Sequence, residues 1–169
     1  LPKYLNSPES LWFHKSKIVF GLYQAQKNIR EMDESVIVEG YFDVIALHAA
    51  GFPHAVATCG TSLTPDHLQQ LLRLGKKITV LFDGDDAGRA ATERAMELGL
   101  QSGLIIYGAK LPDSVDPDEL LFDQETGQQK QDGQQKMKAI LADAQPLLDH
   151  SIRLQMASAV YGPDQRTQA

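Results

Sequence analysis

The sequence predicts an α/β protein: a mainly parallel sheet flanked by helices, with a helical appendage at the C-terminal end. Short apolar runs of strand length alternate with helical patterns of about ten residues between positions 36 and 107, and this alternation is typical of βαβ units. Glycine or proline marks the ends of most of these runs, as expected where strands and helices begin and end. At 169 residues the chain suits one domain, or one domain with an appendage.

The elements of the sheet follow one another in order. Continuous apolar runs predict buried strands, and these runs are at 36–38, 55–57, 78–82 and 104–107. Helical patterns follow the first three strands, at 42–50, 64–74 and 89–98. The second helix has the clearest start, because Thr64 can cap it and Pro65 suits its first position. We expect Gly51, Gly75 and Gly99 to end the three helices.

The α/β domain is predicted to span residues 35–123 and to end in a short capped helix. Residues 1–34 are predicted to be a separate basic segment from the end of a preceding subdomain, with a short helix through 22–26 and a loop at 31–34. The chain opens with Leu1 rather than methionine, so we expect a fragment of a longer protein.

The part after the α/β domain, residues 124–169, is predicted to be a mobile loop followed by a helical subdomain. Residues 124–136 are repetitive, rich in glutamine and poor in apolar side chains, which predicts the loop. Helical patterns follow at 137–143 and 147–159, separated by a proline that cannot continue a helix.

Charge and cysteine content exclude several classes of protein. The net charge is −6, and residues 31–123 alone carry sixteen acidic against six basic groups, whereas residues 1–30 carry five basic groups against one acidic group. An acidic body argues against wide, nonspecific binding of duplex nucleic acid by this chain alone. Cys59 is the one cysteine, which excludes an intrachain disulfide and a cysteine-rich zinc site and fits a reducing cytoplasm. No apolar run approaches the roughly 20 residues that span a bilayer, so we expect no membrane contact.

Acidic residues follow three of the predicted strands. Glu39 follows the first strand, Asp83 and Asp85 follow the third, and Asp116 and Asp118 come after the fourth. The carboxyl ends of parallel strands meet at one edge of a sheet, where functional groups collect. Hard carboxylate oxygens suit Mg²⁺ or Mn²⁺, and two such ions about 4 Å apart could stabilise both oxygens of a phosphoryl transfer. Taken alone, the acids after the third strand could equally form an acidic surface turn, and Asp116 could simply cap a helix.

The order of these motifs resembles the TOPRIM domain of bacterial-type primases, topoisomerases of types IA and II and small nucleases. The resemblance to the DnaG-type bacterial DNA primases is the most specific. It rests on segments within residues 1–123: Lys3-Tyr4-Leu5-Asn6-Ser7-Pro8-Glu9, Phe13-His14-Lys15, residues 36–44, Gly60-Thr61-Ser62, residues 83–91 and Asp116-Pro117-Asp118.

This resemblance implies template-directed synthesis of short RNA primers for DNA replication, with single-stranded DNA as template and NTPs as substrates. The catalytic residues implied are Glu39, an acid/base-type residue near the metal ions, together with Asp83 and Asp85. The implied metal-binding residues are Glu39, Asp83, Asp85, Asp116 and Asp118, with Asp43 close by. The residues implied to contact nucleotide or template are Lys3, Tyr4, Asn6, Lys15, Gly60, Thr61 and Ser62.

The resemblance also implies a setting in the bacterial cytoplasm, at the replisome, as part of a primosome. The replicative helicase would bind a further domain downstream, zinc would belong to a domain upstream, and the single-stranded DNA-binding protein is a possible partner. Isolated from those domains, this chain is expected to be poorly active.

Other functions stay open at this stage. One is a different TOPRIM nucleic-acid enzyme, such as a nuclease or a phage-type primase–helicase. A phosphatase with an Asp-x-Asp motif at the end of a strand would use Asp83 and Asp85, but it leaves Glu39 and Gly40 unexplained. A receiver-like or binding domain would use the acids for regulation.

Overall fold

The computed structural model describes residues 7–11, 13–58, 60–82, 86–112 and 115–149. Within these residues six strands form one sheet, in the order β1-β3-β2-β4-β5-β6. The four inner strands are parallel, and the short edge strands β1 and β6 run antiparallel to their neighbours. The strands are β1 (Val19–Phe20), β2 (Glu34–Val38), β3 (Ala55–Thr58), β4 (Lys77–Phe82), β5 (Ile106–Lys110) and β6 (Gln145–Pro146).

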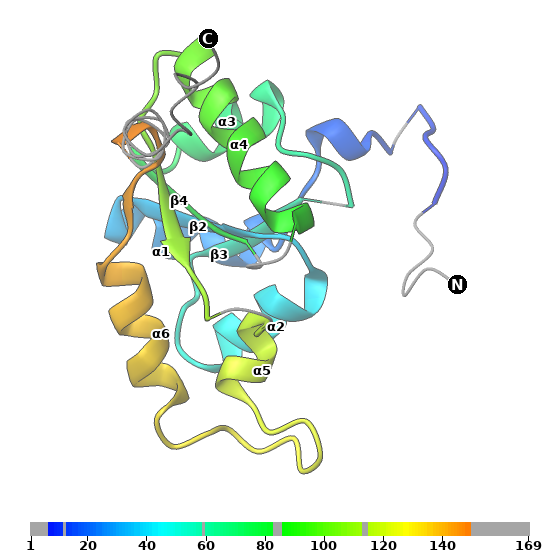
Figure 1. Cartoon of the computed structure of the whole chain (residues 1–169). Coiled ribbons are helices and arrows are strands. Elements are labelled where there is room, and N and C mark those ends of the chain that lie inside the picture. Colours follow the sequence, from blue (N-terminus) through cyan, green and yellow to red (C-terminus); the bar gives the residue numbers. More distant parts are fainter. Residues whose placement is uncertain (1–6, 12, 59, 83–85, 113–114, 150–169) are drawn as a thin grey trace, which may run out of the picture.

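Helices cover both faces of the sheet, as Figure 1 shows for α3 and α4 above it and α2, α5 and α6 below it. The α-helices are α1 (Leu22–Met32), α2 (Tyr41–Ala49), α3 (Pro65–Leu72), α4 (Asp86–Gln101), α5 (Pro117–Leu121) and α6 (Gly133–Ala142). A 3₁₀-helix, η1 (Lys15–Lys17), precedes β1. Among the described residues, no helix combines the length and the apolar character needed to cross a bilayer.

The core has two halves, one on each face of the sheet. Along β2, Val36 and Val38 pack into one half with side chains of α2, α5 and α6, whereas Ile37 packs into the other with side chains of α1, α3 and α4. β4 alternates in the same way, with Leu81 in the first half and Val80 in the second. Side chains of successive strand residues point to opposite faces, so a strand buried on both faces is a nearly continuous apolar run, here with the buried hydroxyl residues Ser35 and Thr79 included. The continuous apolar runs of the sequence are therefore explained by the helices on both sides, and the predicted α/β class is confirmed.

The elements before the first predicted strand differ from the prediction. α1 continues to Met32 and β2 begins at Glu34, so the predicted loop at 31–34 is wrong. Only Asp33 separates the two elements, in a left-handed conformation with φ 54°. Its side chain and its carbonyl accept hydrogen bonds from Lys76 N–H and Lys77 N–H, and these bonds stabilise this tight connection next to β4.

Two predicted helix boundaries also differ. α4 runs through Gly99 to Gln101, so Gly99 does not end that helix. A Cβ atom at Gly99 would lie 3.0 Å from the carbonyl oxygen of Leu104, so the glycine permits close packing instead. α6 begins at Gly133, earlier than the predicted 137, and the preceding segment is a turn in which Asp123 accepts bonds from Thr126. The predicted helix at 147–159 is described only as far as residue 149.

Candidate functional site

The predicted site lies at the point where the chain direction across the sheet reverses. From β2 the chain passes through α2 to β3 on one side, and from β4 it passes through α4 to β5 on the other side. β2 and β4 are hydrogen-bonded neighbours, and α2 and α4 pack on opposite faces of the sheet. Ligands of open α/β sheets bind in the crevice outside the carboxyl ends of such a pair of strands. Glu39 follows β2 directly, so it lies at this crevice. Asp83 is the next residue in the sequence after β4, but it lies outside the described residues.

The turn from β2 into α2 holds Glu39 and Asp43 near each other. Gly40 is the residue before α2, and its N–H donates to Asp43 Oδ2 at 2.9 Å. A Cβ atom at Gly40 would lie 2.7 Å from that same oxygen, so any larger residue would displace the carboxylate. Glycine at this position therefore lets Asp43 close the turn, and Glu39 is held half-buried at its entrance.

Asp116 and Asp118 are positioned by the short helix α5, which packs against α2. Asp116 precedes the helix but makes no side-chain capping bond, so the alternative that its side chain serves as a helix cap is not supported. Asp118 Oδ1 accepts the N–H of Glu119 at 2.9 Å. Pro117, Leu120 and Leu121 are buried beneath the helix, which leaves both aspartates half-buried on its outer side.

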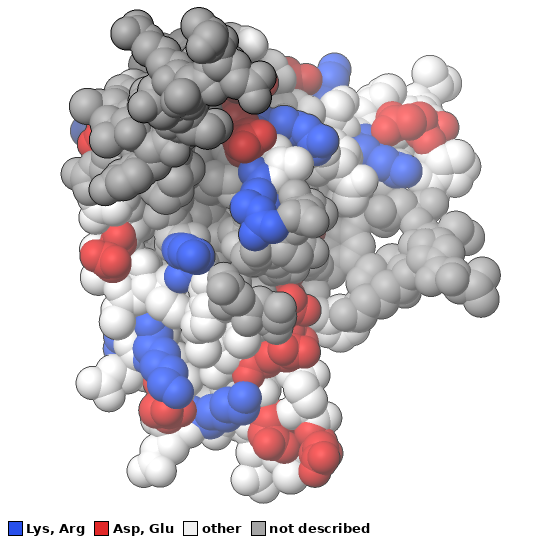
Figure 2. Space-filling view, in the orientation of Figure 1, with Lys and Arg blue, Asp and Glu red and all other residues white. Residues whose placement is uncertain are grey.

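Electrostatics show that the four described carboxylates share one region. The pKa of Asp43 is raised to about 6, mainly by burial; the Gly40 N–H lowers it, and the negative charges of Asp118, Asp116 and Glu39 also raise it. Figure 2 shows acidic side chains gathered over the region of α2 and α5. Carboxylates that repel each other in this way are stabilised when a cation lies among them.

This raised pKa makes a prediction for the metal-free chain. A carboxyl whose folded pKa lies above its ordinary value of 3.8 stabilises the fold below that ordinary value, and this contribution is lost as pH rises through about 6. We expect Asp43→Asn, which keeps an oxygen acceptor for Gly40 N–H, to raise the melting temperature in EDTA above pH 6. The difference from wild type should disappear near pH 4.

Asp123 provides a control of opposite sign. Hydrogen bonds from the Thr126 backbone and hydroxyl lower the pKa of Asp123, so its contribution to stability is present at neutral pH and lost as pH falls. Asp123→Asn should therefore lower the melting temperature at neutral pH and have little effect in acid. If the melting temperature of Asp43→Asn differs from that of wild type by the same amount at every pH from 4 to 8, the raised pKa assigned to Asp43 is contradicted.

The residues present fit a divalent cation, but the described ones do not complete a site. Among the described residues, no three His, Cys, Asp or Glu side chains lie close enough to hold an ion. Charges affect one another's pKa over about 10 Å, whereas coordination bonds are about 2.0–2.6 Å long. Carboxylates that affect the pKa of Asp43 therefore need not bind the same ion. Asp83 and Asp85, directly after β4, lie outside the described residues. The donor type is nevertheless the one that Mg²⁺ and Mn²⁺ prefer.

The predicted nucleotide-binding residues are only partly described. Lys3, Tyr4 and Asn6 lie outside the described residues. Gly60, Thr61 and Ser62 form the loop after β3, where Gly60 has a left-handed backbone with φ 67°. Arg94 of α4 donates from Nη1 to Ser62 Oγ at 3.3 Å, which ties this loop to the opposite wall of the crevice. Lys15 lies in η1, which contacts α3.

One basic residue at this edge was missed from the sequence. β5 extends to Lys110, which lies in register with Phe82, the residue before Asp83. Its position at the carboxyl end of a strand is the signal that would have identified it, but the predicted strand ended at Tyr107. Lys110 is exposed, so a cation borders the acidic crevice.

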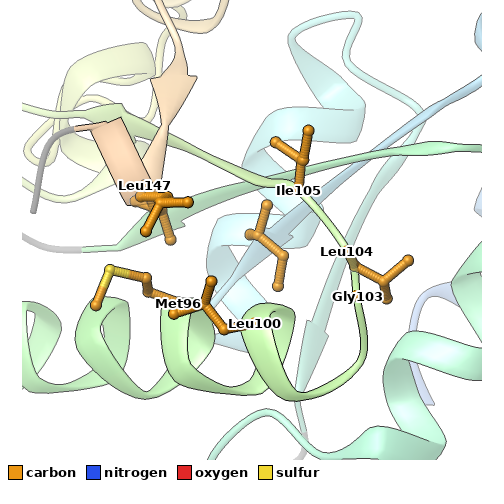
Figure 3. Close-up of a pocket in the computed structure, with 8 residues that line it drawn as sticks. Met96, Leu100, Gly103, Leu104, Ile105 and Leu147 are labelled. Carbon is orange, nitrogen blue, oxygen red and sulfur yellow. The ribbon is translucent and has the colours of Figure 1, made fainter. Parts of the chain in front are cut away.

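An apolar cavity in the described part lies away from these carboxylates. A cavity of about 180 Å³ is lined by apolar side chains of α4, of the start of β5 and of the segment after β6, among them Met96, Leu100 and Leu147 (Figure 3). A phosphate-bearing ligand needs donors or cations, and this lining offers no polar side chain. The cavity therefore does not correspond to the acidic site.

Comparisons with known proteins agree with this arrangement. A family model described as Toprim-like matches residues 36–121. The chain is 42% identical over 162 residues to the DNA primase of Pseudomonas aeruginosa, which covers 94% of this chain and 23% of that protein. It is 38% identical over 152 residues to the DNA primase of Aquifex aeolicus, with coverage of 90% and 29%. The chain thus spans about a quarter of the length of these curated relatives.

Solved structures give the same result. A DNA primase domain from Pseudomonas aeruginosa superposes with a TM-score of 0.79 and 39% identity, covering 99% of this chain and 50% of that one. The structure of a DnaG primase catalytic domain bound to single-stranded DNA superposes with a TM-score of 0.72 and 41% identity, covering 86% and 46%.

Proposed function

Because the chain belongs to the Toprim-like family and is similar to the RNA polymerase domains of bacterial DNA primases, we propose that it is the catalytic part of a primase. Its reaction would be template-directed transfer of a nucleotide from an NTP to the 3′-hydroxyl of a growing RNA primer, with release of pyrophosphate. The observation that supports the proposal is the electrostatic effect of Glu39, Asp116 and Asp118 on Asp43, next to the carboxyl end of β2.

The acidic residues would have two roles, binding of a cation and interaction with the attacking hydroxyl. Asp83, Asp85, Asp116 and Asp118 would hold a divalent cation, Mg²⁺ or Mn²⁺, which supplies charge neutralisation at the reacting phosphates when bound. Glu39, which is half-buried at the end of β2, would interact with the attacking hydroxyl or with the cation. Without a cation the same carboxylates repel phosphate groups, so we expect binding of nucleotide in the crevice to require it.

Basic and backbone groups would bind the anionic ligands. Lys3, Tyr4, Asn6 and Lys15 would contact nucleotide or template, and the Gly60-Thr61-Ser62 loop would offer backbone and hydroxyl groups at the carboxyl end of β3. The template would be single-stranded DNA, which is bound by a structural relative of this chain. The replicative helicase and the single-stranded DNA-binding protein would be partners of the whole primase in the bacterial cytoplasm, and zinc would belong to another of its domains.

Titration with Mn²⁺ tests the proposed metal site. The chain should bind Mn²⁺, measured from the electron paramagnetic resonance signal of the free ion, and Glu39→Gln/Asp83→Asn/Asp85→Asn should weaken this binding at least about tenfold, because three hard ligands lose their charge. Glu119→Gln, which removes an exposed carboxylate from the same region, is the control and should bind like wild type. Unchanged binding by the triple variant would refute the assigned ligands.

A further inference from the structure

One face of α3 binds three consecutive backbone carbonyls of the η1 turn (Lys15–Lys17). The donors are Thr64, His67 and Gln70, which are spaced three residues apart and therefore lie on the same side of the helix. The three contacts are Thr64 Oγ1 to Ser16 O at 2.7 Å, His67 Nε2 to Lys15 O at 3.1 Å and Gln70 Nε2 to Lys17 O at 2.7 Å. Because a carbonyl only accepts, His67 Nε2 must carry the hydrogen in its contact.

A further contact to the same turn comes from Glu9. Its Oε1 accepts the N–H of Lys15 at 3.0 Å, and its Oε2 lies 3.3 Å from His14 Nδ1. The backbone of the turn is therefore held by four side chains, while Lys15 is half-exposed and Lys17 exposed. This arrangement fixes the origins of the two lysine side chains and leaves their ammonium groups available to solvent.

Strand pairing places this turn at the functional edge of the sheet. Val19, the first residue of β1, lies opposite Thr58, the last residue of β3, and the two strands are antiparallel. The residues just before Val19 must then lie beyond the carboxyl end of β3. The Gly60-Thr61-Ser62 loop leaves β3 at the same end and leads to Thr64.

We infer that Thr64, His67 and Gln70 are positioning residues, which hold the η1 turn so that Lys15 and Lys17 bind phosphate groups at the edge of the crevice. This inference rests on the proposed function, because it concerns the phosphates of a nucleotide or of a template strand. A fixed backbone reduces the conformational entropy that a flexible lysine-bearing segment would lose on binding. Burial also lowers the pKa of His67, so near neutral pH the ring is neutral and makes this contact as the tautomer with its hydrogen on Nε2.

Gln70 offers the cleanest test, because Gln69 is its exposed neighbour on the same helix. Gln70→Met keeps a similar length but removes the donor to Lys17 O, and also a bond to Asp66 O at 3.2 Å within the helix itself. Gln69→Met makes the same chemical change away from the turn. Loss of the hydrogen bond to Lys17 O, at about 1 kcal/mol, corresponds to about a fivefold change in an equilibrium constant. We expect Gln70→Met, but not Gln69→Met, to speed amide hydrogen exchange at 17–18 and to weaken phosphate-ligand binding about fivefold.

Binding is measured with the whole chain for two ligands, ATP with Mn²⁺ and a single-stranded DNA oligonucleotide. A loss confined to ATP assigns the turn to the nucleotide, a loss confined to DNA assigns it to the template, and either supports the inference. In a Lys15→Gln/Lys17→Gln background, Gln70→Met should cause no further loss, because positioning acts only through the lysines. Thr64→Ser, which keeps the hydroxyl, should bind like wild type, whereas Thr64→Val should not.

If Gln70→Met speeds amide hydrogen exchange at 17–18 but binds ATP and DNA like wild type, the positioning role is overturned. If amide hydrogen exchange at 17–18 is unchanged in Gln70→Met, the assigned contacts are overturned. An equal further loss in the double-lysine background would also overturn it, because the effect would then not act through Lys15 and Lys17. A wild-type chain that binds neither ligand would overturn the proposed function together with this inference. Wild-type binding that survives Gln70→Met overturns the inference alone.

Discussion

Glu39→Gln is expected to reduce primer synthesis at least about 100-fold, within the range that acid–base groups contribute in enzymes. Glutamine keeps the shape of the side chain but can neither accept a proton nor hold a cation with a full negative charge. The glutamate is held half-buried at the end of β2, beside carboxylates that share its electrostatic environment. The measurement is incorporation of labelled ribonucleotides on a single-stranded DNA template by the full-length protein.

The control for this experiment separates chemistry from folding. Neutralising Glu39 relieves a repulsion, so the melting temperature of Glu39→Gln in EDTA should equal or exceed that of wild type. Glu119→Gln, an exposed carboxylate next to Asp118, should retain synthesis within about twofold, since it has no proposed contact with substrate. If Glu39→Gln keeps more than a tenth of wild-type synthesis, Glu39 does not have the proposed role.

Leu121→Ala should have the largest effect on stability. Leu121 is fully buried, with 0% exposure, in the half of the core that also contains Leu47 of α2 and Met137 of α6. Removing three carbons from such a position costs about 2–5 kcal/mol. For a domain of this size we expect the melting temperature to fall by about 5–15 °C.

The same substitution should also weaken the metal site, because α5 carries Asp116 and Asp118. We expect weaker Mn²⁺ binding at temperatures where the variant is still folded by circular dichroism. Leu100→Ala, at a leucine of α4 that is 52% exposed, should change stability by less than about 0.5 kcal/mol and leave Mn²⁺ binding unchanged. A fully stable Leu121→Ala variant would show that α5 is not anchored through this side chain.

The inner part of the fold could be predicted because its signals are local and strong. Strands buried on both faces are continuous apolar runs, and the start of α3 is set by Thr64, whose side chain accepts the His67 N–H at 3.2 Å. The edge strands were not predicted, because a strand of two residues such as Val19–Phe20 has no period to detect. The role of Gly99 was misjudged because its cause is a contact with Leu104 and Ile106, which only the packed structure supplies.

The candidate site divides in the same way. Parallel strands bring their carboxyl ends to one edge, so Glu39 and the acids after the later strands could be grouped from order alone. The contacts between α3 and η1 could not, because they join side chains to backbone carbonyls 48 to 53 residues away in the chain. Such bonds leave no periodic pattern in the sequence. In the sequence, a helix face whose polar side chains bind backbone carbonyls cannot be told from a helix face exposed to solvent.

The short edge strands have a consequence for behaviour in solution. An open sheet presents unpaired N–H and C=O groups at its two outer strands, and a second molecule can add to them. Here both outer strands, Val19–Phe20 and Gln145–Pro146, are two residues long, and one contains a proline that cannot donate. In the described part of the chain, these two outermost strands therefore offer few groups with which a further strand could pair. We expect them to disfavour association of two molecules through these strands.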